Sequence, residues 1–363
     1  MCAGVLFALL FPLLFARAVQ EHSTQPCARA AQPVWVERRL AVMGTWFELR
    51  VRAGERAVAL EASERAVRAL AACEERLSTW SEDSELARLN RAPVGEWQEL
   101  SPELAADLAR AWHFRDATGG AFDSGLGALV EAWGLRTGGR QPTGAELAAA
   151  LAAGGLAGFE LEGRHALRRH PQAAIEEGGF GKGSGLDAAL AALRAAGVSE
   201  AVLDLGGQLA VLGGACTAAL ADPRERGRPV LELDLGPGSL STSGNSERGI
   251  VVDGVARAHL LDPRTGAPAE DFGSLSVWAA DATAADCLST GLYVLGPEQA
   301  LRFAAAHPEI ELVLLLTEGA RLRAVATAAW RGRVRALVPE LELTFVEVSS
   351  LPPSGPIAAL TSR

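Results

Sequence analysis

The sequence predicts a mixed α/β (α+β) fold, because stretches of helical periodicity and short strand-like runs follow one another along the chain. Apolar residues recur at helical spacing over residues 57–77 and again from Leu186 onward. Residues 46–51 alternate between apolar and polar side chains, and residues 201–205 form a short apolar run, as strands do. A glycine-rich segment at 175–187 joins a strand-like stretch to a helical one. The 363 residues are enough for one large domain or two moderate ones.

The first half of the chain is predicted to be mainly helical. The strand at 46–51 follows Gly44, which allows another group to approach the backbone closely. Ser101 followed by Pro102 is a strong helix start, an N-cap with proline at the next position, and predicts a helix to Ala117. The other elements expected here are a long helix at 57–77, helical segments at 84–90 and 146–153, a loop at 134–143 and the end of a short strand at 173–175.

The second half is predicted to contain most of the strands. Residues 201–205 and 209–212 flank a Gly-Gly pair and predict a hairpin. Asp253-Gly254 predicts the turn of a second hairpin within 250–256, and the polar run 240–245 is interpreted as a turn. The remaining expectations are strands at 231–235, 275–279, 312–316 and 341–345 and helices at 284–295 and 297–306.

Composition and charge restrict the partners of the protein. Apolar residues make up 49% and charged residues 21%, as in ordinary globular proteins. The net charge of −10 argues against a nucleic-acid partner, because no basic surplus is present to neutralise phosphates. An anionic ligand therefore needs a locally positive site or a metal ion. The five cysteines include no Cys-x-x-Cys pair, and Cys73, Cys216 and Cys287 are interpreted as small buried apolar residues.

The ends of the chain are predicted to lie outside the folded domain. Residues 1–18 combine a short apolar run with a small-x-small ending at Ala18, which predicts a signal peptide and an exported protein, periplasmic or associated with a membrane. An uncleaved anchor or a misassigned start codon is the alternative. Residues 19–37 are expected to form a linker, residues 38–348 the domain, and residues 349–363 a disordered tail.

The glycine-rich segment is the stretch around which the domain is expected to be arranged. Five glycines fall within residues 178–185, with Lys182 among them. A strand, a glycine loop and a helix in succession expose backbone N–H groups to an anion, and the helix N-terminus adds partial positive charge. The alternative is a tight turn whose glycines serve packing. The spacing fits neither a Walker loop nor a dinucleotide fingerprint.

A second set of residues indicates magnesium. Asp286 and Thr290 are four positions apart on a predicted helix, so both oxygen-bearing side chains share one face. Carboxylate and hydroxyl oxygens suit magnesium, and Ser289 and carbonyls of the glycine segment could complete the ligand shell. The alternative is a capped or solvent-facing Asp286 with a packed Thr290.

Isolated residues elsewhere could contact a ligand. His259 precedes the turn-forming run 262–266 and could act as a general base or a ligand contact, or be structural. Trp80, Phe122 and Asp123 could stack on and hydrogen-bond to an aromatic ligand, although each alone is better explained as a packing residue.

These segments, taken in order, resemble the ApbE family of FAD:protein FMN transferases. The resemblance covers about residues 40–330, and the shared order and spacing of short motifs carry it. The matching segments are Met43-Gly44-Thr45, Ser78-Thr79-Trp80, Ser84-Glu85-Leu86 with Asn90, Gly120-Ala121-Phe122-Asp123, Leu129-Val130 with Trp133-Gly134, Gly178-Gly179-Phe180-Gly181-Lys182-Gly183 with Asp187, Leu205-Gly206-Gly207, Thr242-Ser243-Gly244, His259-Leu260-Leu261-Asp262-Pro263-Arg264-Thr265-Gly266 and Ala285-Asp286-Cys287-Leu288-Ser289-Thr290.

The resemblance implies two lobes of mixed sheet and helices with FAD in the cleft between them. It implies FAD contacts at Met43, Trp80, Ala121, Phe122, Asp123, Glu176, Lys182 and Leu261, and magnesium ligands at Asp286, Ser289, Thr290 and a carbonyl near Gly179. His259 and Asp286 are the implied catalytic residues, with His259 activating the acceptor hydroxyl. The sequence differs from the family at Glu176-Glu177, where Asp-Leu is usual, at Phe180-Gly181, where Ile-Ala is usual, and at Ser184, where an aromatic residue is common.

The resemblance implies a magnesium-dependent transfer of FMN from FAD to a Thr or Ser hydroxyl of an acceptor flavoprotein, with release of AMP. Magnesium and the amides of the glycine segment would neutralise the pyrophosphate. Two alternatives share the site. One is a magnesium-dependent FAD pyrophosphatase that gives FMN and AMP, and the other is a non-catalytic FAD-binding carrier.

Overall fold

The computed structural model describes residues 33–245, 250–252, 255–257 and 259–347. The predicted signal peptide at 1–18, the linker as far as Gln32, the Asp253-Gly254 turn and the tail at 349–363 lie outside the described residues. Among the described residues, no helix combines the length and the apolar character needed to cross a bilayer.

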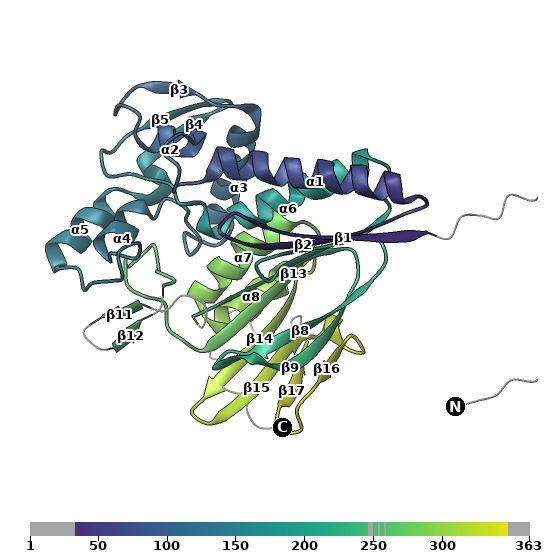
Figure 1. Ribbon diagram of the computed structural model, residues 1–363. Coiled ribbons are helices and arrows are strands. Elements are labelled where there is room, and N and C mark those ends of the chain that lie inside the picture. The colour runs from purple at the N-terminus through teal and green to yellow at the C-terminus, as the bar shows by residue number, and fades with distance from the viewer. Residues whose placement is uncertain (1–32, 246–249, 253–254, 258, 348–363) are drawn as a thin grey trace, which may run out of the picture. The chain divides into compact units, whose positions relative to one another are not determined.

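The predicted mixed α/β fold is confirmed by a nine-stranded sheet covered with helices (Figure 1). Neighbouring strands are antiparallel except for the last pair, which is parallel. In spatial order the strands are β1 (Val34–Val42), β2 (Thr45–Ala53), β6 (Glu200–Leu205), β7 (Gln208–Leu212), β10 (Gly238–Gly244), β13 (Gly273–Ala279), β14 (Glu311–Glu318), β15 (Arg321–Thr327) and β17 (Glu342–Val346).

Helices cover one face of this sheet. Near β1, β2 and β6, the face is covered by α1 (Arg56–Leu77) and α6 (Gly181–Ala195), which pack against each other. Near β10, β13 and β14, it is covered by α7 (Ala282–Leu295), with α3 (Pro102–Ala117) and α8 (Pro297–Ala306) packed around it. The glycine segment and Asp286 thus belong to two adjacent helices on one face.

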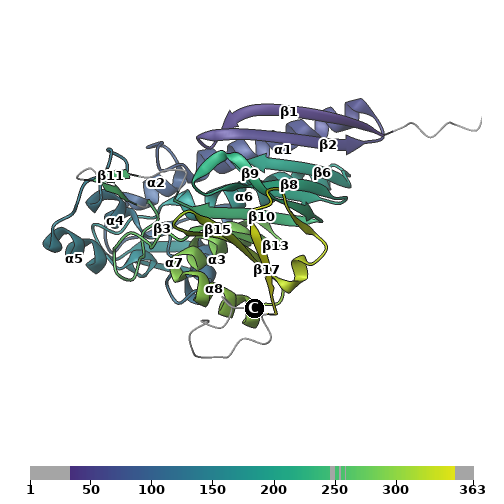
Figure 2. The same cartoon turned by 90° about the horizontal axis from the view of Figure 1, so that it is seen from below.

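A smaller sheet covers the opposite face. It consists of β8 (Cys216–Asp222), β9 (Glu225–Leu235) and β16 (Val334–Ala336). Successive side chains of a strand point to opposite faces of the sheet, so each strand of the large sheet can pack against both layers. On β14, Leu314 packs in the core under the helices and Leu315 packs in the core shared with β9. Figure 2 shows β8 and β9 beside the central strands of the large sheet, seen from below.

The remaining α-helices and strands are not part of the two sheets described above or of the helices that cover them. They are α2 (Glu85–Asn90), α4 (Gly127–Ala132), α5 (Gly144–Ala152), the three-stranded sheet of β3 (Trp97–Glu99), β5 (His165–Arg168) and β4 (Phe159–Glu162), and the hairpin of β11 (Ile250–Val252) and β12 (Val255–Arg257).

Local chemistry accounts for the element ends that the sequence predicts. The Ser101 hydroxyl accepts a hydrogen bond from Leu104 N–H, and Pro102 occupies the first turn of α3. Gly206 and Gly207 have φ of 59° and 89°, so they form the tight turn between β6 and β7. The predicted helices at 57–77, 102–117 and 297–306 are confirmed to within a residue.

Four predictions are corrected by the structure. The strand end at 173–175 is wrong, because the Asn90 side chain instead pairs with both backbone groups of Ile175, at 2.8 and 2.9 Å. The turn at 240–245 is wrong, because residues 238–244 form the central strand β10. The linker ends before residue 34, where β1 begins. Cys216 is half-buried rather than buried, whereas Cys73 and Cys287 are fully buried.

Candidate functional site

The N-terminus of α7 is fixed by acidic side chains, and this sets the position of the predicted metal ligands. Asp281 caps the helix by accepting from Ala284 N–H at 2.8 Å. Asp187, from α6, accepts from Ala282 N–H at 2.8 Å and from Thr283 N–H at 3.0 Å. Negative charge at a helix N-terminus is stabilising, so Asp187 ties α6 to the helix that carries Asp286.

Asp286 joins α7 to the glycine segment. Its side chain is 3% exposed, which excludes the solvent-facing alternative. One carboxylate oxygen lies 3.0 Å from Lys182 Nζ, and the other accepts from Gly183 N–H at 2.9 Å. A buried carboxylate is stable only when charges and donors compensate it, and here both come from residues 182 and 183.

Thr290 and Gly179 lie side by side next to this pair. A Cβ atom built on Gly179 would lie 3.7 Å from Thr290 Oγ1. The Thr290 hydroxyl donates to the Asp286 carbonyl at 3.2 Å, and the residue is half-exposed. The predicted juxtaposition of the glycine segment with Asp286 and Thr290 is therefore present.

The glycine segment differs from the predicted open loop, since α6 already begins at Gly181. None of the glycines in 178–185 has a positive φ. Instead, Gly183 and Gly185 are required by packing: a Cβ on Gly183 would lie 2.5 Å from Ala282 O, and one on Gly185 2.5 Å from Leu70 Cδ1. The packing alternative thus explains these two positions, while the surroundings of Gly178 are open.

Ser289 is oriented differently from its neighbour Thr290. It is fully buried, and its hydroxyl is bonded to Ser241 Oγ at 3.1 Å and to Ser243 Oγ at 3.0 Å, both on β10. It also donates to the Asp286 carbonyl at 3.0 Å. These contacts use the hydroxyl to hold α7 against the sheet.

Around Trp80, an exposed aromatic ring is surrounded by charged side chains. Trp80 is 71% exposed, and the Arg136 guanidinium lies 4.6 Å from its ring centroid. Arg136 also forms an ion pair with Glu176 and donates to the Thr79 carbonyl at 3.1 Å. Burial raises the pKa of Glu176, and the neighbouring Arg136 opposes that shift.

Met43 lies over the first turns of α6 in a conformation that is rare for its residue type. Its φ is 51°, and its N–H donates to Glu74 Oε1 at 2.8 Å. Its Sδ would lie 3.0 Å from a Cβ on Gly185 and its Cε 3.5 Å from one on Gly181. Met43 and Gly44, with φ of 51° and 68°, are the two residues of the tight turn between β1 and β2, and such hairpin turns commonly need positive φ at both positions.

The segment Ala121-Phe122-Asp123 is buried, so its side chains form a wall rather than a binding surface. Phe122 is 2% exposed, and its ring offers no open face for stacking, contrary to one expectation. Asp123 accepts from Gly125 N–H at 2.7 Å, Leu156 N–H at 2.9 Å and Arg115 Nε at 2.9 Å. Burial raises the pKa of Asp123, while these donors oppose the shift.

The segment that follows His259 packs against α4. Leu261 is buried and pairs with Pro268, and Trp133 Nε1 donates to Gly266 O at 2.7 Å. His259 itself is half-buried, and the adjoining Leu260 packs on the core that contains Phe122. The roles of His259 and Leu261 toward a ligand stay predictions.

The donor set at Asp286 fits magnesium. Among the residues that the structure describes, no group of three or more His, Cys, Asp or Glu side chains could hold a metal. Magnesium needs no such group, since proteins commonly bind it through one or two carboxylates together with substrate phosphates. Asp286, the Thr290 hydroxyl and the backbone at Gly179 supply oxygen atoms of this kind, whereas a zinc site would require nitrogen or sulfur ligands.

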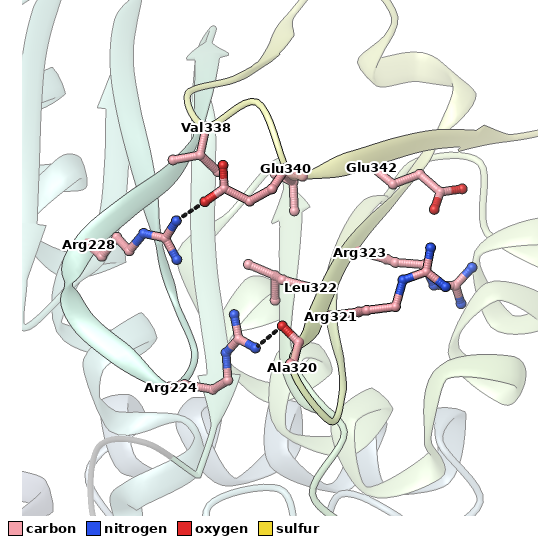
Figure 3. A pocket seen from close by; sticks show the side chains of 10 residues that line it. Arg224, Arg228, Ala320, Arg321, Leu322, Arg323, Val338, Glu340 and Glu342 are labelled. Carbon is pink, nitrogen blue, oxygen red and sulfur yellow. Dashed lines mark hydrogen bonds and ion pairs between the residues drawn. The ribbon is translucent and has the colours of Figure 1, made fainter.

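Two cavities are lined by other parts of the chain. One, of about 420 Å³, lies between the β8–β9 hairpin and β15 and contains four arginines (Figure 3). Arg228 in its wall pairs with Glu340, and Arg224 donates to the Ala320 carbonyl, so these charges already have partners. The second cavity, of about 320 Å³, is lined by Asp123, Arg115 and Arg264 and adjoins the wall described above.

Sequence reasoning missed Arg136 and the capping role of Asp187. Arg136 lies in a loop rich in glycine, arginine and threonine, where periodicity carries no information about contacts. Asp187 lies within the glycine-segment motif, but a local pattern contains no information about its partner, the N-terminus of α7.

Comparisons with known sequences support one family. The family model described as the ApbE family matches residues 43–314. An FAD:protein FMN transferase of Rhodobacter capsulatus is 34% identical over 265 residues, which are 70% of this chain and 50% of the relative. The chain thus spans about half the length of that relative. The FAD:protein FMN transferase of Treponema pallidum (strain Nichols) is 30% identical over 332 residues, 85% of this chain and 91% of the relative.

Solved structures have the same fold. The crystal structure of the ApbE protein from Thermotoga maritima is similar with a TM-score of 0.72 and 27% identity, over 78% of this chain and 94% of that one. The flavin transferase ApbE from Vibrio cholerae is similar in fold with a TM-score of 0.73 at 24% identity, over 83% of this chain and 100% of that one.

Proposed function

The chain belongs to the ApbE family, and we propose that it transfers FMN from FAD to a Thr or Ser hydroxyl of an acceptor flavoprotein, releasing AMP. The relatives named as FAD:protein FMN transferases support the reaction type. The observation that carries the proposal for this chain is the convergence of Lys182, Gly183 and Thr290 on Asp286.

This arrangement suits the charge of the substrate. The pyrophosphate of FAD is anionic and must be neutralised before a hydroxyl can attack it. Lys182 supplies one positive charge, and Asp286, Thr290 and a carbonyl near Gly179 would hold magnesium. When bound, magnesium would polarise the phosphoryl oxygens and neutralise the charge that develops on the leaving group.

The proposed reaction is a displacement at phosphorus. The acceptor oxygen forms a bond to the FMN-side phosphorus, and the bond from that phosphorus to the bridging oxygen breaks. AMP leaves with the bridging oxygen, and His259 takes the proton of the acceptor hydroxyl. The product carries FMN in a phosphoester linkage.

The same residues could serve an FAD pyrophosphatase, in which water replaces the acceptor, or a carrier that performs no chemistry. Incubation with FAD, Mg²⁺ and a threonine-containing acceptor domain separates the three. An acceptor that gains the mass of FMN supports the proposal. Free FMN without modified acceptor would identify a pyrophosphatase, and unchanged FAD would identify a carrier.

The cellular location is part of the proposal. The leader predicted at residues 1–18 supports export, with the protein periplasmic or associated with a membrane. Mass spectrometry of the N-terminus of the protein from its native cell tests cleavage after Ala18.

A further inference from the structure

Arg136 connects two segments that the sequence keeps far apart. It lies in the loop between α4 and α5, yet its guanidinium contacts Trp80 and Thr79, which follow α1, and Glu176, which precedes α6. Nη1 donates to the Thr79 carbonyl at 3.1 Å, and Nη2 donates to the Thr79 hydroxyl at 2.5 Å. The side chain therefore has polar partners on two segments besides the aromatic ring.

The loop itself is built to hold this position. Gly139 N–H donates to Gly134 O at 2.9 Å, and Arg140 N–H donates to Trp133 O at 2.8 Å. Gly134, Gly138 and Gly139 have φ of 61°, 102° and 93°, a region that glycine adopts at little cost. These hydrogen bonds close the loop between residues 133 and 140, so the backbone that carries Arg136 is held in place.

Trp80 remains mostly open despite this contact. The ring is 71% exposed, with the guanidinium 4.6 Å from its centroid on one face. An arginine stacked on one face of an indole leaves the other face free, and a fixed ring loses less entropy when a second ring stacks on it. A flavin or an adenine is such a ring.

We propose that Arg136 is a positioning residue for the flavin dinucleotide: it fixes the Trp80 ring through one face so that the other face stacks on an aromatic ring of FAD. This inference rests on the proposed function, since it takes FAD as the ligand. In this proposal Arg136 acts through Trp80, and its contacts with Thr79 and Glu176 hold it in place. It has no direct role at the phosphorus that reacts.

The test measures FAD affinity and turnover separately. Arg136→Ala should weaken FAD binding about fivefold to tenfold and raise the KM for FAD to the same extent, while kcat at saturating FAD stays within about twofold. Arg136→Lys keeps the charge but loses the planar stack and the fork of donors, so it should restore only part of the affinity.

A double-mutant cycle with Trp80→Ala separates positioning from direct attraction. Once Trp80 is removed, adding Arg136→Ala should change the FAD dissociation constant by less than about twofold. Arg39→Ala is the matched control, because Arg39 also lies 4.6 Å from an exposed ring, that of Trp46 on the β1–β2 hairpin, and forms an ion pair with Glu48. It should leave FAD affinity unchanged. Thermal unfolding checks that each variant is folded.

Three outcomes would overturn the inference. Equal losses with and without Trp80 would mean that Arg136 attracts FAD by charge alone. Tighter FAD binding by Arg136→Ala would mean that the guanidinium competes with FAD for the Trp80 ring. Unchanged FAD binding by Trp80→Ala would mean that the ring is not part of the FAD site. If FAD binds as predicted in all variants but no acceptor is modified, the proposed transfer fails and the positioning role stands.

Discussion

Lys182 Nζ lies 3.0 Å from a carboxylate oxygen of Asp286, although 103 residues separate the two in the chain. The ammonium group thus offsets the charge of the buried carboxylate. The same carboxylate accepts from the backbone of Gly183 at 2.9 Å, so the first turn of α6 and the middle of α7 are fixed to each other. The account of function depends on this contact, because it brings a carboxylate and a cation together beside Thr290 and Gly179, both of which are half-exposed.

Two adjacent hydroxyls on α7 are predicted to have different roles. Thr290→Val should lower turnover about 10- to 100-fold and raise the Mg²⁺ concentration needed for half-maximal rate, because it removes an oxygen beside Gly179. Thr290→Ser keeps the oxygen and should retain most activity. Steady-state rates over a magnesium titration provide the measurement.

Ser289→Ala is the comparison for Thr290. It removes the bonds to Ser241 and Ser243, so it should lower the free energy of unfolding by about 1 kcal/mol while leaving the magnesium requirement unchanged. A shifted magnesium requirement in Ser289→Ala, with none in Thr290→Val, would reverse the assignment of the two hydroxyls.

The glycines of the segment should differ in their tolerance of a methyl group. Gly183→Ala places a Cβ 2.5 Å from both Ala282 O and Thr283 Cα, so it should destabilise the fold by about 1 to 3 kcal/mol through overpacking. Gly178→Ala meets no atom within 4 Å and should change stability by less than about 0.5 kcal/mol. Denaturant unfolding of both variants checks this, and equal effects at the two positions would contradict the packing explanation.

The acid dependence of stability should reveal the cap of α5. A hydrogen bond from the Arg140 side chain, together with bonds from the Thr143 backbone and hydroxyl, lowers the pKa of Glu146 to about 2. A carboxyl whose pKa is lower in the folded than in the unfolded state stabilises the fold above its unfolded pKa of about 4.3, and this contribution is lost as pH falls toward 2. Glu146→Gln should therefore lower the melting temperature at pH 7 and have a much smaller effect near pH 2. A difference as large at pH 2 as at pH 7 would contradict the assignment.

The described cysteines should react with alkylating reagents in a fixed order. Burial raises the pKa of Cys73 to about 12 and also that of Cys287, so both remain protonated and inaccessible at pH 8. Cys216 is half-buried and should be labelled first among these three by iodoacetamide. Peptide mapping by mass spectrometry follows each site, and early labelling of Cys73 or Cys287 in the folded protein would show that the core opens more readily than the structure indicates.

Periodicity and capping were sufficient to predict most helices, because an apolar stripe and an N-cap are local signals. Asp286 and Thr290 fall on one helix face for the same reason. The distinction between Thr290 and Ser289 could not be predicted, because it depends on β10, whose Ser-Thr-Ser run looks like a turn until α7 is packed on it. The polar residues of this strand are satisfied by partners that are distant in sequence.

The surroundings of Trp80 could not be predicted either. Arg136 lies 56 positions beyond Trp80 in the chain, in a loop without periodicity. The apolar residues before the glycines are typical of a strand, but the backbone N–H and C=O of Ile175 bond to the Asn90 side chain instead of to a neighbouring strand. Contacts of these kinds form between residues that are distant in sequence, so a local sequence pattern cannot predict them.

The most direct test of the central claim is the effect of Asp286→Asn on modification of an acceptor. The substitution keeps the size of the side chain but removes the charge that pairs with Lys182 and that would hold magnesium. With FAD, Mg²⁺ and a threonine-containing acceptor domain, the unaltered protein should add the mass of FMN to the acceptor, and the folded Asp286→Asn variant should do so at least about 100-fold more slowly. Modification of the acceptor at the unaltered rate by this variant would contradict the account.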